Sequence, residues 1–305
     1  MRIGVIGAGA MGSVFAAGLA AAGHTVTVLA RRALYIDAVN ARGGLAVEFR
    51  ERERIVPCRL SLEPADLAAS ELIVVLVKSM QTDEAAIALA AFPAPGRPVL
   101  TLQNGLGNME TLRKRLPDNP ILAGITTCAA TGLAPGSSRL ISAGETVLGP
   151  LDFEDREHAG LAADLLTEAG FPTTATDDPH PFLWRKLLVN IAINPLTALT
   201  DLRNGDIAAS GPLRSVAEAA IAEGKAVAGA LGIAVPGDAT ARFLAVCDAT
   251  AGNLSSMAQD IKAGRRTEID ALNGAVSHLG RQAGIPTPVN DTLAALVRGR
   301  EGGVD

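Results

Sequence analysis

The first half of the chain alternates short apolar runs with longer segments whose apolar residues recur at helical spacing. Short apolar runs bounded by turn residues are typical of strands buried on both faces of a sheet. The predicted strands are Arg2–Ile6, His24–Ala30, Glu71–Lys78, Pro98–Leu102, Ile121–Thr127 and Phe171–Thr176, the predicted helices are Ser13–Ala22, Thr82–Ala91, Asn108–Leu116 and Glu157–Ala169, and strands joined by turns are expected within 131–148. This alternation predicts a mainly parallel, doubly wound α/β sheet.

The second half of the chain loses the strand pattern after the acidic, proline-containing segment DDPHP at 177–181. Long helical patterns follow. The predicted helices are Phe182–Thr200, Pro212–Leu231, Asp238–Ala263, Thr267–Ala283 and one near Val289–Val297. We therefore expect two domains, an α/β domain over 1–178 and an all-α domain over 179–305.

A glycine-rich turn follows the first predicted strand. Gly7, Gly9 and Gly12 have the spacing G-x-G-x-x-G, with a helix after them and a second strand at the expected distance. Gly7 permits the tight turn, Gly9 leaves room for a pyrophosphate, and Gly12 lets the helix pack closely on the sheet. The helix N-terminus offers free N–H groups to the phosphates. The pattern predicts a dinucleotide site, which flavin enzymes also use; the alternative is a tight turn without a ligand.

The residues after the second predicted strand indicate which dinucleotide binds. An NAD site usually has an acidic residue here, to accept hydrogen bonds from the ribose. This chain has Arg31 and Arg32, with no acid before Asp37. Guanidinium groups suit a phosphate, so the sequence favours NADPH. The alternative is a solvated basic pair in a loop.

Composition excludes several classes of protein. Hydrophobic residues make up 48% of the 305 residues and the mean hydropathy is +0.27, yet no apolar stretch approaches the roughly 20 residues of a membrane span. The net charge of −5 and the single Trp and Tyr argue against nucleic-acid binding. The three cysteines, Cys58, Cys128 and Cys247, lack the spacing of a disulfide framework or a zinc site. We expect a cytoplasmic protein without a metal, bound to neither membrane nor nucleic acid.

A line of polar residues interrupts the most apolar predicted helix, Phe182–Thr200. Lys186, Asn190 and Asn194 lie at i, i+4 and i+8, on one face. Burying a lysine is costly unless it is paired, so the line indicates a polar cleft. The alternative is a thin solvated stripe with hydrogen bonds between helices.

Other polar residues form two further groups. Asn253, Ser256 and Asp260 fall at i, i+3 and i+7 of the predicted helix Asp238–Ala263, and Glu268 follows near the start of the next one, where it could also serve as a cap. Lys78 and Asn104 end predicted strands of the doubly wound sheet. Ligands bind outside the carboxyl ends of such strands. The alternatives are a surface charge for Lys78 and a turn residue for Asn104.

Together these segments resemble the ketopantoate reductase (2-dehydropantoate 2-reductase) family over essentially the whole chain. The matching segments are GAGAMG at 7–12, the basic Arg31, KSMQT from Lys78, QNGLGN at 103–108, WRKLLVNIAINPLTAL at 184–199 and SSMAQDIKAGRRTEIDALNG at 255–274. The resemblance implies a Rossmann-type NADPH-binding domain followed by a helical substrate domain like the C-terminal domain of 6-phosphogluconate dehydrogenase. The implied reaction is the reduction of 2-dehydropantoate to (R)-pantoate, in pantothenate and coenzyme A biosynthesis. Another 2-oxo acid, or an NADPH-binding module without turnover, remains an alternative.

The resemblance also implies roles for individual residues. Lys186 is the general acid, and Glu268 holds the substrate hydroxyl or orients Lys186. The cofactor is held by Gly7, Ala8, Gly9, Ala10, Met11, Gly12, Arg31, Lys78, Asn104 and Glu268. The substrate is held by Asn104, Lys186, Asn190, Asn194, Asn204, Asn253 and Ser256. The partner is a small-molecule 2-oxo acid, and both a monomer and a homodimer are compatible with the sequence.

Overall fold

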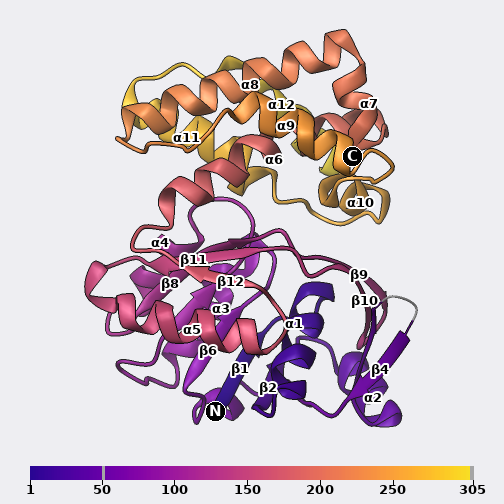
Figure 1. The fold of residues 1–305 in the computed structure, drawn as a ribbon, viewed down its shortest axis with the longest axis vertical. Coiled ribbons are helices and arrows are strands. Elements are labelled where there is room, and N and C mark those ends of the chain that lie inside the picture. The colour runs from indigo at the N-terminus through magenta and orange to yellow at the C-terminus, as the bar shows by residue number, and fades with distance from the viewer. Residues whose placement is uncertain (50–51, 303–305) are drawn as a thin grey trace. The chain divides into compact units, whose positions relative to one another are not determined.

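The computed structural model describes residues 1–49 and 52–302, and its chain divides into two compact units. The first unit comprises Met1–Gln103 and Asn108–Pro179. The second begins at His180 and also takes in the short loop Asn104–Gly107. The first unit contains all the strands of the described residues, and the second consists of helices and their connections (Figure 1).

The first unit is organised around an eight-stranded sheet in the order β12-β11-β8-β7-β6-β1-β2-β5. The strands are β1 (Arg2–Ile6), β2 (Thr25–Leu29), β5 (Arg59–Ser61), β6 (Leu72–Val75), β7 (Val99–Thr101), β8 (Ile121–Thr126), β11 (Thr146–Pro150) and β12 (Thr173–Ala175). All neighbours run parallel except β8 and β11. β1 lies between β2 and β6, with Ile3 paired to Val26 on one side and to Leu72 on the other. The predicted doubly wound sheet is confirmed.

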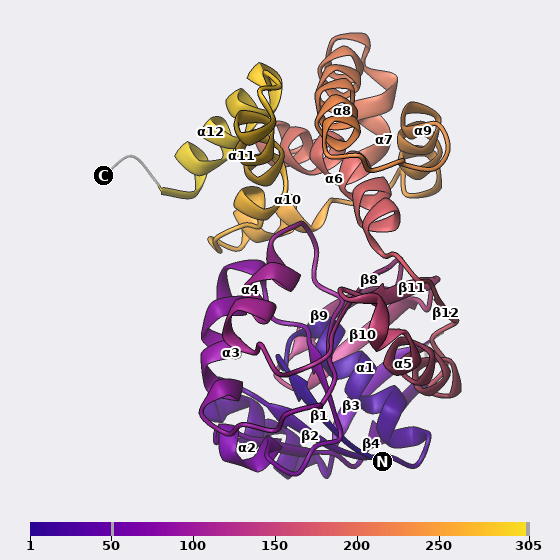
Figure 2. The same cartoon turned by 90° about the vertical axis from the view of Figure 1, so that its left-hand side faces the viewer.

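Helices cover both faces of this sheet. They are α1 (Ala10–Ala21), α2 (Ala33–Arg42), α3 (Thr82–Ala90), α4 (Asn108–Arg115) and α5 (Arg156–Glu168), with short 3₁₀ turns at Pro64–Leu67, Ser79–Gln81 and Phe153–Asp155. α3 and α4 lie on one face and α1 and α5 on the other (Figure 2). Phe15 of α1 stacks on Phe171 with 4.1 Å between ring centroids, which joins α1 to the segment before β12.

A second sheet packs against α1, in the order β4-β3-β10-β9. Its strands are β3 (Leu45–Phe49), β4 (Arg52–Val56), β9 (Ala129–Ala134) and β10 (Ser137–Ser142). The sequence predicts strands in the region of β9 and β10 but not β3 or β4. β4 is a short, charged edge strand with mostly exposed residues. Its sequence therefore lacks the alternation of apolar and polar residues by which a half-buried strand is recognised.

The helical unit is built around α6 (His180–Thr200). The other helices are α7 (Asn204–Ala209), α8 (Gly211–Ala230), α9 (Ala239–Ala249), α10 (Ser256–Lys262), α11 (Asn273–Ala283) and α12 (Pro288–Gly302), with a 3₁₀ turn at Ile269–Ala271. α6 contacts α8, α9, α10 and α12, and most of its residues, including Trp184, Leu188 and Ile191, are buried. Because neighbours surround it, α6 is apolar on nearly every side.

Two predicted helices are wrong in their extent. The single helix Asp238–Ala263 is interrupted, because α9 ends at Ala249 and α10 begins at Ser256, after Ser255 accepts a cap hydrogen bond from the Ala258 amide. Asn253 therefore lies outside a helix and shares no helical face with Ser256 and Asp260. The predicted helix Thr267–Ala283 starts only at Asn273. The sequence signals were Gly252 and the serine cap, which compete with helix continuation.

Candidate active site

The glycine-rich turn joins β1 to α1 at the point where the strand order reverses. The chain passes from β1 to β2 and β5 on one side, and then crosses to β6 on the other. Gly7 has φ +115°, and a Cβ there would lie 2.9 Å from the Leu76 carbonyl carbon. A Cβ on Gly12 would collide with the Gly7 carbonyl oxygen. The packing of the turn itself therefore requires these two glycines.

Gly9 has a different role, because the chain itself does not need a glycine there. A Cβ at Gly9 would meet no atom within 4 Å. Gly9 is also the N-cap of α1, and no side chain caps this helix end. Uncapped N–H groups beside open space form an anion site. This arrangement fits the pyrophosphate of a dinucleotide approaching the backbone, with Ala8, Ala10 and Met11 completing the turn.

Arg31 follows β2, as a residue that reads the adenosine ribose should. Its side chain is 58% exposed, and its Nη1 lies 3.7 Å from Glu84 Oε2 on α3. Because an exposed ion pair contributes little, the contact with Glu84 leaves Arg31 able to bind a phosphate. Arg32, also exposed, precedes α2.

The loops after β6 and β7 are tied together by Gln103, whose role the sequence did not reveal. Gln103 is 7% exposed, and its Nε2 donates to the Val77 carbonyl (2.8 Å) and to Thr82 Oγ1 (2.9 Å). Its Oε1 accepts from Thr101 Oγ1 (2.9 Å). Since Val77 immediately precedes Lys78, Gln103 holds the backbone that carries Lys78. A buried polar residue at a strand end was the available signal.

The polar stripe of α6 lies on a helix most of whose residues are buried. Lys186 and Asn190 are partly exposed, while Asn194 is 7% exposed. Their neighbours in the chain, such as Leu187, Val189 and Ile193, are buried. A partly exposed lysine on a helix that is largely enclosed is accessible to a bound ligand.

The loop Asn104–Gly107 lies against the segment that carries Glu268. Asn104 Nδ2 donates to Glu268 Oε2 at 3.3 Å, and the Leu106 amide donates to the Ala271 carbonyl at 2.9 Å. Gly105 has φ +83°, and a Cβ on it would press on Ala271. Glu268 is 6% exposed. The structure thus brings together two residues that are 164 positions apart and that the sequence predicted separately.

The remaining predicted substrate residues lie around the start of α10. Ser256 is its exposed first residue, and the preceding Ser255 accepts a hydrogen bond from Thr197 of α6 (2.6 Å). Asn253 is exposed, and its carbonyl accepts from the Asn204 amide (3.0 Å). Asn204 is buried, with its Nδ2 donating to Thr250 Oγ1 (2.9 Å). These contacts indicate that Asn204 holds the loop on which Asn253 lies.

Cysteines, metal-ligating groups and apolar helices in the described part of the chain bear on other kinds of function. Burial raises the pKa of the Cys58 thiol to about 12 and that of Cys247 to about 11, so neither is a ready thiolate. Within residues 1–49 and 52–302 no three His, Cys, Asp or Glu residues group as a metal site, and no helix there is long and apolar enough to cross a membrane.

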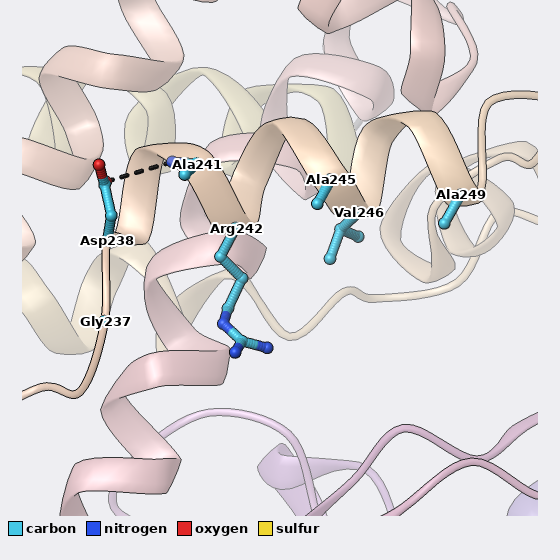
Figure 3. Close-up of a pocket in the computed structure, with 7 residues that line it drawn as sticks. All are labelled: Gly237, Asp238, Ala241, Arg242, Ala245, Val246 and Ala249. Atoms are coloured by element: carbon cyan, nitrogen blue, oxygen red, sulfur yellow. Dashed lines mark hydrogen bonds between the residues drawn. The ribbon is translucent and has the colours of Figure 1, made fainter.

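A hollow of about 400 Å³ along α9 is separate from these residues (Figure 3). Its lining is one stretch of chain, from Gly237 to Ala249, with Asp238 and Arg242 as its charged members. Asp238 accepts hydrogen bonds from the Thr240 and Ala241 amides as the cap of α9. None of the predicted catalytic or binding residues lines the hollow, so it is not the candidate active site.

The mainly parallel sheet, with the glycine-rich turn where its strand order reverses, defines a Rossmann-type dinucleotide-binding protein with a helical second unit. The chain belongs to the ketopantoate reductase PanE/ApbA family, whose model matches residues 3–152 and whose C-terminal model matches residues 181–301. A 2-dehydropantoate 2-reductase of Halobacterium salinarum is 38% identical over 298 residues, which is 98% of each chain. One from Archaeoglobus fulgidus is 36% identical over 304 residues, 99% of each chain.

Solved structures agree on the fold. A PanE/ApbA family ketopantoate reductase from Ralstonia eutropha JMP134 superposes with a TM-score of 0.91 at 34% identity, covering 99% of this chain and 98% of that one. A D-mandelate dehydrogenase, solved with NADH and anilino(oxo)acetate, also has a TM-score of 0.91, at 29% identity and the same coverage. A ketopantoate reductase and a D-mandelate dehydrogenase therefore share the fold of this chain.

Proposed function

We propose that the protein reduces 2-dehydropantoate to (R)-pantoate with NADPH. The observation that carries the proposal is the polar stripe of α6, in which Lys186 and Asn190 are partly exposed and Asn194 is buried, on a helix most of whose residues are buried. A cation and two amides on one helix face suit a substrate with a carboxylate and a carbonyl that gains negative charge during reduction. Membership of the family supports the same reaction.

The turn from Gly7 to Gly12 would hold the pyrophosphate of NADPH, and Arg31 its 2′-phosphate. The open space at Gly9 and the uncapped N-terminus of α1 support this assignment. Lys78 lies three residues beyond the end of β6, immediately before the 3₁₀ turn Ser79–Gln81, and is a further cofactor residue. When bound, NADPH supplies the hydride that the carbonyl carbon of the substrate receives.

Lys186 supplies the proton of the reaction. As the carbonyl carbon accepts hydride, its oxygen gains negative charge, which an ammonium group within hydrogen-bond reach stabilises. Proton transfer from Nζ to that oxygen completes the alcohol and leaves a neutral amine, which recovers a proton from solvent. A nearby carboxylate favours the protonated amine. Glu268 would provide that carboxylate or accept a hydrogen bond from the substrate hydroxyl.

The substrate is held by amide and hydroxyl groups in the same unit. Asn190, Asn194 and Ser256 would donate to its carboxylate and hydroxyl, and Asn253 is a further donor. Asn104, which donates to Glu268, would meet the carbonyl end of the substrate or the nicotinamide. Asn204 contributes through the loop of Asn253, since its own amide nitrogen is engaged by Thr250.

A second candidate is the reduction of a different 2-oxo acid with the same residues. D-mandelate dehydrogenase, similar over the full chain, was solved with anilino(oxo)acetate, in which a carbonyl adjoins a carboxylate. The polar stripe recognises that part of any 2-oxo acid, and pocket residues that read the far end of the substrate decide between them.

The test is the loss of NADPH absorbance at 340 nm with 2-dehydropantoate, beside phenylglyoxylate, 2-oxoisovalerate, pyruvate and oxaloacetate. We expect kcat/KM to be highest for 2-dehydropantoate and higher with NADPH than with NADH. A higher kcat/KM for another 2-oxo acid would change the proposed substrate and leave the proposed catalytic residues unchanged. Binding of NADPH without oxidation by any acid would refute the enzymatic function. Cytoplasmic location and possible dimerisation remain predictions from the sequence.

A further inference from the structure

Pro195 lies inside α6, directly after Asn194, the last of the three α6 positions that the proposed function uses. The helix runs from His180 to Thr200 without a break at Pro195. A proline has no amide hydrogen, so the Ile191 carbonyl, four residues earlier, loses its normal helical donor. Ile191 is fully buried, with Asn190 before it and Asn194 just before the proline. A buried carbonyl in this position needs a donor from elsewhere.

That donor comes from another helix. Asn273, the first residue of α11, donates from Nδ2 to the Ile191 carbonyl oxygen at 3.0 Å. The Asn273 side chain is 0% exposed. Its Nδ2 also donates to Asn290 Oδ1 of α12 at 2.9 Å. The side chain therefore replaces the hydrogen bond that Pro195 removes, and water cannot compete for it.

The orientation of this amide is determined by a chain of hydrogen bonds that starts at a carboxylate. Glu223 of α8 can only accept while ionised, and it accepts from Asn290 Nδ2 at 2.7 Å. The same nitrogen donates to the Ala220 carbonyl at 3.1 Å. The oxygen of Asn290 must then face Asn273, whose nitrogen in turn faces Ile191. Hydrogen bonds linked in this way strengthen one another.

Glu223 is itself held in place. It accepts from the backbone amides of Val289 (2.8 Å) and Asn290 (2.9 Å) in the first turn of α12. The adjacent Gly224 permits α8 to approach α6 closely, because a Cβ there would lie 2.6 Å from Leu188 Cδ2. The chain from Glu223 to Ile191 thus links α8, α12, α11 and α6 inside one unit.

Asn273 also follows directly on the segment of Glu268. The Leu272 amide donates to the Glu268 carbonyl at 3.1 Å, and α11 begins with the next residue. One buried amide therefore connects the backbone near Glu268 with the backbone between Asn190 and Asn194. With an ordinary residue at 195, a helical N–H would also donate to the Ile191 carbonyl, so the backbone there would depend less on Asn273.

We infer that Asn273 is a positioning residue for substrate binding, which aligns Asn190 and Asn194 with Glu268 by donating to the carbonyl that Pro195 leaves without a helical donor. This inference rests on the proposed function, in which those three residues hold the substrate. Asn273 does not itself touch the substrate.

A double-mutant cycle between Asn273 and Pro195 tests the inference. Asn273→Ala removes the donor, and Pro195→Ala restores a backbone N–H that can bond to Ile191 within the helix. We expect Asn273→Ala to lower kcat/KM for 2-dehydropantoate by about tenfold or more, with KM raised, and to change the Kd for NADPH less than about twofold. In the Pro195→Ala background the same change should cost less than about threefold.

Ser277→Ala is the matched control. Ser277 lies one turn further along the same face of α11, is 3% exposed, and its hydroxyl has no hydrogen-bond partner among the described residues. Its loss should leave kcat and KM near those of the wild type. If Asn273→Ala yields no folded protein, Asn273→Ser takes its place in the cycle.

Amide hydrogen exchange over residues 187–197 provides a readout that does not require turnover. Asn273→Ala should speed exchange there and the double variant should restore protection. Additive losses in the cycle, or normal kinetics of Asn273→Ala, would overturn the inference. If the wild type reduces no 2-oxo acid, the proposed function fails; unchanged exchange would show separately that Asn273 does not hold α6.

Discussion

The nucleotide-binding turn and the polar set of the helical unit are assembled in different ways. In the turn, Gly7, Gly9 and Gly12 lie within six residues, and the shape of the backbone is the site. In the helical unit, the Asn104 loop, the α6 stripe and Glu268 come from three distant segments. Neighbouring residues are placed by local geometry, whereas distant ones depend on helix packing and buried hydrogen bonds. Substitutions that add a side chain to the glycine turn should therefore impair the first site. The second site should also be impaired by substitutions that remove hydrogen bonds or packing contacts far from the substrate.

Removing the proposed proton donor should have the largest effect. We expect Lys186→Ala to reduce kcat by about 10²–10⁴-fold, because the developing charge on the carbonyl oxygen loses both its partner and its proton source. The Kd for NADPH, measured by fluorescence titration, should stay within about twofold, since the turn is intact. Normal kcat would exclude Lys186 as the acid.

Two glycine substitutions within the turn separate cofactor binding from folding. Gly9→Ala adds a methyl group that the chain can accommodate, so the melting temperature without ligand should be unchanged while NADPH binds about tenfold or more weakly. Gly12→Ala collides with the Gly7 carbonyl and should lower the melting temperature by about 5 °C or more. Differential scanning fluorimetry and titration distinguish these outcomes. A Gly9→Ala variant with wild-type affinity would mean that the cofactor does not approach there.

Gly105→Ala probes the loop that lies against Glu268. Its φ of +83° and the contact with Ala271 disfavour any side chain. The displaced loop should weaken the Asn104–Glu268 hydrogen bond and reduce kcat/KM by about tenfold. Gly107→Ala is the control, because it shares a positive φ but a Cβ there meets nothing within 4 Å. Equal losses in both variants would trace the effect to backbone strain alone.

Arg31→Ala should have the most selective effect. The Kd for NADPH should rise by about ten- to a hundredfold, while that for NADH changes less than about threefold, because only NADPH has the 2′-phosphate. Glu84→Gln, which removes the exposed ion-pair partner of Arg31, should change either Kd by less than about twofold. Parallel losses for both cofactors would show that Arg31 does not read the phosphate.

Patterns within a few residues predicted much of the molecule. Buried strands such as Leu72–Val75 appear as continuous apolar runs, and the glycine spacing at 7–12 places a turn between β1 and α1. The failures share a cause. β4 is charged and exposed, and the break between α9 and α10 depends on the Ser255 cap, whose hydroxyl also accepts from Thr197. Helical periodicity across 238–263 could not reveal that competition.

The sequence by itself determined the doubly wound sheet, the candidate dinucleotide turn and the polar face of α6. These features follow from chain geometry over one strand, one turn or one helix, where periods of two and 3.6 residues apply. Only the tertiary structure brought Asn104 to Glu268, and Asn273 to the Ile191 carbonyl that Pro195 leaves without a helical donor. These pairs are separated by 164 and 82 positions, and the need to satisfy buried polar groups selects such partners only after the helices have packed.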